Sequence, residues 1–270
     1  MKFKNLTLFS IGVAIFCIAA RTVTLLYATQ SGTGFFISRL SSLGISLSIS
    51  IFLLAIVAVI FAFALKGKAH SPFELSKLSG IASFLLGFTI LLNSFGFNSH
   101  SFVIQWQYTL EVIAGILAGC WFIIYGVGAF IKFKLPDITA IIPCVYFILR
   151  LVVVFTALST SALVAEHVFS LAYHVSVMVF MLYFGRAVAG VPSKNISKTF
   201  FPIKTAAFIF TTTSVFSRLI MLLLGKTEMI HSEAGLDLTG IMLSIFMILI
   251  TADIYKESKK VIKEEDSNEL

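Results

Sequence analysis

Long, uniformly apolar runs alternate with short polar segments along almost the whole chain. A helix needs about 20 mostly apolar residues to cross the hydrocarbon core of a bilayer. Runs of that kind lie at 6–27, 43–65, 78–93, 106–131, 138–158, 168–188, 203–224 and 236–255, of which 78–93 is the shortest. They lack the period-two alternation of membrane β-strands. The pattern therefore predicts an all-α integral membrane protein with about eight transmembrane helices.

The composition supports this prediction. Hydrophobic residues make up 58% of the chain and charged residues only 12%, whereas soluble domains carry roughly 25% charged residues. The mean hydropathy is +1.00, so we expect the lipid bilayer to be the principal partner. The net charge of +7 does not indicate nucleic-acid binding, because the basic residues are dispersed in short clusters between apolar runs.

The polar segments between the runs differ in their content of lysine and arginine. Most basic residues lie in one alternating set, at 2–4, 66–77, 132–134, 186–204 and 256–263, while the opposite set holds only Arg39 and Lys226. Cytoplasmic loops retain basic residues. We therefore expect a multi-pass protein of the plasma membrane with both termini in the cytoplasm. The first run resembles a signal peptide but exceeds the usual apolar length, so we interpret it as a retained span.

The chain also has features of an internal duplication. Cut near Pro136, it divides into a first four-helix half (1–135) and a second (136–256). A charged cytoplasmic tail (257–270) follows, which we expect to be a solvated helix end that frays into disorder. The sequence separation from Arg21 in the first half to Arg150 in the second is nearly the same as that from Glu111 to Asp237. Halves of equal topology form a parallel repeat about an axis along the membrane normal. The alternative is that apolar helices of similar length align by chance.

Several ionisable residues lie within the predicted spans, in the half of each span that faces away from the cytoplasm. The candidates for ligand binding are Arg21, Arg150, Arg218, Glu111, Asp237 and His174. A charge near the bilayer centre costs about 2.5–3.5 kcal/mol on insertion scales. The arginines could form a hydrated vestibule that binds an anionic group through their planar forks. Alternatively, they pair with the two acids or reach the headgroups, and then serve the packing of the bundle.

Catalytic and metal-binding signatures are missing. The chain has no G-x-S-x-G, no H-E-x-x-H and no P-loop. Cys17, Cys120 and Cys144 lie far apart in apolar runs, without the spacing of disulfides or metal ligands. We therefore expect no catalytic residue, metal or cofactor, and an enzyme is the less favoured class.

Three functions remain open. The leading hypothesis is a small transporter or permease-like protein that binds an anionic or amphiphilic small molecule. The alternative is a non-catalytic membrane sensor, assembly or partner-binding component. The third is a membrane-embedded lipid-modifying enzyme that would use His174 and Glu111. Asp253 and Arg186 lie at cytoplasmic helix ends, where we expect them to be solvated, and Gly115 with Gly119 predicts a close-packed helix surface.

Overall fold

The computed structural model describes residues 3–30, 36–63, 75–97, 105–159, 164–190, 196–226 and 237–268. These ranges form eight long α-helices and no β-strand beyond an isolated bridge between Thr29 and Phe36. The helices are α1 (Phe3–Val23), α2 (Ser41–Phe63), α3 (Lys77–Leu92), α4 (Gln105–Ile131), α5 (Ile141–Ser159), α6 (Val164–Val188), α7 (Ile196–Leu223) and α8 (Leu238–Asn268). The predicted all-α membrane fold is thus confirmed.

Seven of the described helices are long and apolar enough to cross a membrane, and the apolar part of α8, Leu238–Asp253, is shorter. Two boundaries differ from the sequence prediction. Helix α7 begins at Ile196 and contains Pro202, whose ring leaves the carbonyl of residue 198 without its helical partner. Helix α8 continues to Asn268, because the lysine- and glutamate-rich tail is made of good helix formers. The charged tail is therefore a continuation of the last helix.

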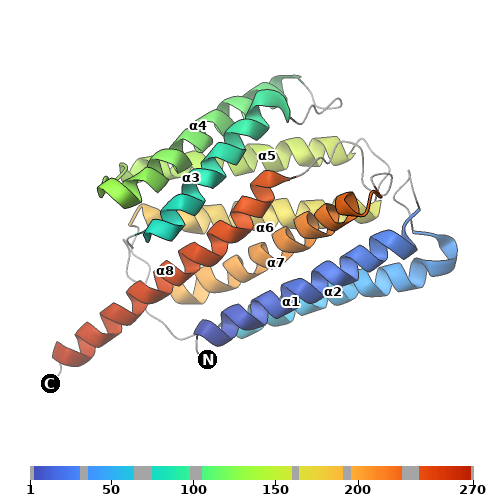
Figure 1. The fold of residues 1–270 in the computed structure, drawn as a ribbon, viewed down its shortest axis with the longest axis horizontal. Helices are drawn as coiled ribbons and strands as arrows, with labels where there is room; N and C mark the ends of the chain where they lie inside the picture. Colours follow the sequence, from blue (N-terminus) through green and yellow to red (C-terminus); the bar gives the residue numbers. More distant parts are fainter. Residues whose placement is uncertain are drawn as a thin grey trace.

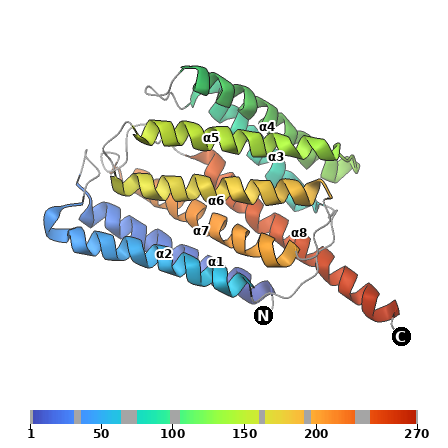
Figure 2. The same ribbon diagram turned by 180° about the vertical axis from the view of Figure 1, so that it is seen from behind.

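Helix α7 is the centre of the bundle. It packs against α1, α2, α6 and α8, while α3 and α4 form a close pair on one flank. Figures 1 and 2 show α3 and α4 on one side, α1 and α2 on the other, and α5 to α8 between them. Both termini lie at the same end of the bundle (Figure 1).

Glycines bring α3 and α4 into backbone contact. A Cβ added to Gly87 would lie 2.5 Å from the carbonyl oxygen of Gly119, and one added to Gly126 would lie 2.5 Å from that of Gly80. Small residues allow such close approach where lipid provides no hydrophobic driving force between helices. The predicted close-packed surface of α4 therefore contacts α3 of the same chain.

The bundle interior away from this pair is aromatic. Phe184 lies at its centre, and its ring packs against those of Phe122, Phe180 and Phe246. These four side chains come from α4, α6 and α8, and all are buried. The outer surface also exposes many large apolar side chains, as lipid requires.

The internal repeat stays a prediction. Among the described residues, α1 packs on α2 as α5 packs on α6, and α3 on α4 as α7 on α8. The contact of α6 with α7 has no comparable counterpart between α2 and α3. The two halves therefore share helix pairings only in part.

Candidate functional site

An ion pair joins α4 and α5 inside the membrane-spanning region. Arg150 Nη1 donates to Glu111 Oε1 at 2.5 Å, and the two side chains are 18% and 6% exposed. The pair lies within spans, where lipid cannot solvate either charge. Pairing across the helix contact explains how both residues are tolerated there.

A second polar contact joins α6 to the start of α8. The hydroxyl of Tyr173 donates to Asp237 Oδ2 at 3.2 Å, and the backbone N–H of Gly240 donates to Asp237 Oδ1 at 2.8 Å. The second bond is that of a helix N-cap, in which a side-chain oxygen satisfies a free N–H of the first turn. Asp237 therefore begins α8 as well as contributing negative charge.

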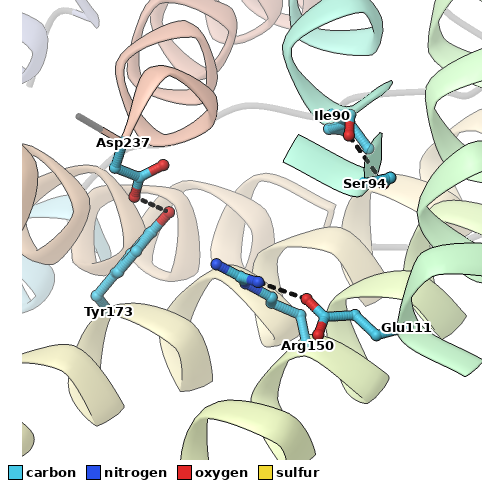
Figure 3. A network of polar contacts seen from close by, with 6 residues as sticks. All are labelled: Ile90, Ser94, Glu111, Arg150, Tyr173 and Asp237. Atoms are coloured by element: carbon cyan, nitrogen blue, oxygen red, sulfur yellow. Dashed lines mark hydrogen bonds and ion pairs between the residues drawn. The ribbon is translucent and has the colours of Figure 1, made fainter. Parts of the chain in front are cut away.

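Arg150 connects these two contacts. Figure 3 shows its guanidinium between the Glu111 carboxylate and the Tyr173–Asp237 pair. In the part of the chain that the structure describes, Arg150 forms one side-chain hydrogen bond, that to Glu111. A guanidinium has five N–H donors. The remaining donors can therefore serve a further acceptor.

His174 belongs to the same polar region. It lies close enough to Arg150, Asp237 and Arg218 to interact with their charges electrostatically. Its Nδ1 lies 2.8 Å from the carbonyl oxygen of Ser170. Because a carbonyl can only accept, Nδ1 carries the hydrogen, and in the neutral ring Nε2 is left as an acceptor.

A small cavity adjoins the ion pair. Its volume is about 10 Å³, roughly the room that one water molecule needs. The lining residues come from α4, α5 and the π-helical segment Asn93–Phe97 that follows α3: they are Asn93, Ser94, Tyr108, Glu111, Val112, Tyr146 and Arg150. Glu111 Oε2 is buried and has no hydrogen-bond partner among the described residues. In this conformation the polar centre is closed, with a spare acceptor beside its cavity.

The structure brings most of the candidate residues together. Glu111 pairs with Arg150, and Arg150, Asp237 and Arg218 lie close enough to His174 to interact with it electrostatically. We call these five the polar centre. Arg21 lies on α1: it is 3% exposed, and its guanidinium lies 4.3 Å from the ring centroid of Phe169 on α6.

Tyrosines contribute to the polar centre although their sequence context did not identify them. Tyr146 lies four residues before Arg150 on α5, and Tyr108 three residues before Glu111 on α4. Residues three or four apart share a helix face. That spacing from a charged residue was the signal that could have found them.

The expectation that Asp253 is solvated was wrong. Asp253 is 6% exposed, and its Oδ2 accepts from the backbone N–H of Ser76 at 2.9 Å and from the hydroxyl of Ser79 at 2.5 Å. Ser76 is the N-cap of α3. Asp253 therefore ties α8 to the start of α3 at the end of the bundle that carries the termini.

No known protein family, curated protein or solved structure matches this chain. Functional conclusions consequently depend on the geometry alone.

Proposed function

We propose that this membrane protein is a small transporter of the permease type, which binds an anionic or amphiphilic small molecule at the polar centre. The observation that carries the proposal is Arg150, a charged residue within the spans that, among the described residues, uses one donor, on Glu111. Ionisable residues inside a membrane are costly, and they commonly mark substrate or ion pathways. Arginine's free donors suit a carboxylate or another planar oxyanion.

The cavity volume limits how such a molecule could bind. At about 10 Å³, the cavity is far smaller than the roughly 300–1,000 Å³ of small-molecule sites. The solute therefore enters only when the helices around Arg150 separate. A closed polar centre between packed helices is compatible with transport by alternating access, in which one bundle moves against another.

The test is anion-dependent thermal stabilisation of the purified full chain in detergent. Chloride, acetate, benzoate and inorganic phosphate are added in turn, since a ligand that binds the folded state raises Tm. We expect at least one anion to raise Tm. Arg150→Lys keeps a charge for Glu111 but loses the planar fork, and should abolish the rise. Arg39→Lys makes the same change at an exposed arginine and should not. If no anion stabilises the wild type, the proposal is wrong.

A second candidate function is that of a partner-binding membrane component. An apolar groove of about 310 Å³ lies on α1 and α2, lined by Phe9, Gly12, Val13, Phe16 and Leu54. The groove and the Arg150–Glu111 pair both suit a protein whose helices pack against another. This function predicts a stable complex in mild detergent and no effect of anions on Tm.

For the lipid-modifying alternative, His174 Nε2 would have to be the reacting nitrogen, since Nδ1 is bonded to Ser170.

We infer that the end of the bundle with both termini faces the cytoplasm of a cell whose plasma membrane holds the protein. The excess of basic residues in the segments at that end supports this orientation. Single cysteines at the exposed positions Lys226 and Lys132, in a background without the native cysteines, provide the test. An impermeant thiol reagent on whole cells should label position 226 and not position 132. The reverse pattern would invert the orientation.

A further inference from the structure

Lys204 is a buried cation on the central helix, outside the polar centre. It is 3% exposed, and its Nζ lies 5.2 Å from the ring centroid of Phe208. Among the described residues it forms no hydrogen bond and no ion pair, and the Phe208 ring provides a cation–π contact. Lysine is almost never fully buried unless it is paired. An anion is the partner that would complete such a site.

Aromatic residues flank Lys204 along α7, and a buried hydroxyl follows it directly in the sequence. One turn earlier on α7, Phe200 packs against Phe180 of α6, with ring centroids 5.7 Å apart. The neighbouring Thr205 is 1% exposed, and its hydroxyl has no hydrogen-bond partner among the described residues. Pro202 weakens the α7 hydrogen-bond ladder just before this point, which allows the helix to bend there.

Lys204 shares a face of α7 with the polar centre. Lys204, Thr211 and Arg218 are spaced seven residues apart, which is close to two turns of helix. Thr211 is fully buried, and its hydroxyl also has no partner among the described residues. Between Thr211 and Arg218 on this face, Val215 contacts α8 at Gly240. A stripe of cations and an unbonded hydroxyl thus extends about 21 Å along the central helix, at a rise of 1.5 Å per residue.

We propose that Lys204 is the inner binding position for the transported solute, and that this solute is a monocarboxylate with an apolar body. The inference rests on the proposed transport function and specifies its substrate class. One ammonium balances one negative charge, whereas phosphate carries more charge and strong hydration. The ring of Phe208, beside the ammonium, and that of Phe200, one turn earlier on α7, match an apolar body. The face through Thr211 joins this position to the polar centre.

The test measures equilibrium binding of radiolabelled benzoate to the purified full chain. Lys204→Met removes the ammonium and keeps an unbranched side chain of similar length. We expect benzoate to bind about tenfold or more weakly to Lys204→Met, since hydrogen bonds to charged groups are among the stronger ones. Lys204→Arg should retain most of the binding. Arg186→Met is the matched control, because Arg186 is an exposed cation 5.8 Å from the Tyr183 ring centroid, at the same end of the bundle.

Folding of Lys204→Met is monitored by its Tm without anion, which should be at least that of the wild type because an unpaired buried charge has been removed. Benzoate should raise the Tm of the wild type and of Arg186→Met, but not that of Lys204→Met. Unchanged benzoate affinity in a folded Lys204→Met overturns this inference. So does stabilisation by phosphate or chloride without any benzoate binding, although the transport proposal then survives. If no anion binds, both proposals fail.

Discussion

The most direct test of the polar centre is removal of the Arg150 charge. Arg150→Leu leaves Glu111, whose side chain is 6% exposed, without its hydrogen-bond donor. Two unit charges about 4 Å apart interact by about 4 kcal/mol at an effective dielectric of 20. Breaking one side of a buried pair typically costs about 3–5 kcal/mol, which agrees with that figure. We therefore expect Arg150→Leu to be strongly destabilised, although leucine itself suits a membrane interior.

Double variants separate the pair from its surroundings. Arg150→Leu with Glu111→Gln removes both charges and should recover most of the lost stability. Arg150→Leu with Asp237→Asn should not, because Glu111 remains unpaired. Glu111→Gln alone should cost less than Arg150→Leu, since the Arg150 side chain is 18% exposed and lies within the field of Asp237.

The assay is Tm in detergent, followed by the fraction of protein that elutes as a monodisperse peak after heating. For a chain of this size, roughly 2–4 °C per kcal/mol places the expected loss for Arg150→Leu on the order of 10 °C. A wild-type Tm for Arg150→Leu would refute the pairing argument. Equal rescue by Asp237→Asn and Glu111→Gln would show that the direct contact is not what stabilises Arg150.

Two further substitutions test how the bundle is assembled. Gly87→Ala should destabilise the protein by about 1–3 kcal/mol, because its Cβ would meet the Gly119 carbonyl oxygen. The control is Gly12→Ala, whose Cβ would enter open space. Equal Tm losses in the two variants would contradict close packing of α3 on α4. Asp253→Ala should lower the free energy of unfolding by about 1.5–3 kcal/mol, the range for hydrogen bonds to a charged group, because the donors of Ser76 and Ser79 lose their acceptor. An unchanged Tm would show that these bonds do not hold α8 to α3.

The helices could be predicted from the sequence because lipid imposes a simple requirement. Every backbone polar group in the hydrocarbon region must be bonded within its own segment, so long apolar runs become helices. The helices continue beyond the predicted spans where that requirement does not apply. Helix α7 extends through Pro202 towards its N-terminus, and α8 extends from Tyr255 to Asn268. Both extensions are less apolar than the spans and depend on local helix propensity and packing.

The membership of the polar centre was largely predictable, but its pairing was not. Intramembrane charges identified Glu111, Arg150, Asp237, His174 and Arg218 as candidates. Which acid bonds Arg150 depends on which helices pack together, and sequence spacing carries no such information. Asp237 was equally plausible as a partner for Arg150. In the structure it caps α8 and accepts from Tyr173.

The buried share of each span gives a physical reason why α7 lies at the centre of the bundle. In a membrane, the helix faces that contact lipid must be apolar, so a helix with polar residues on its faces has to be enclosed by other helices. The α2 span is the most apolar of those described, and only 22% of its most apolar stretch is buried, against 56% for α7. Helix α7 carries Lys204, Thr211 and Arg218 on one face, none of which lipid would solvate. The polar residues of this face therefore require α7 to be surrounded by other helices, and the proposed solute path follows the same face.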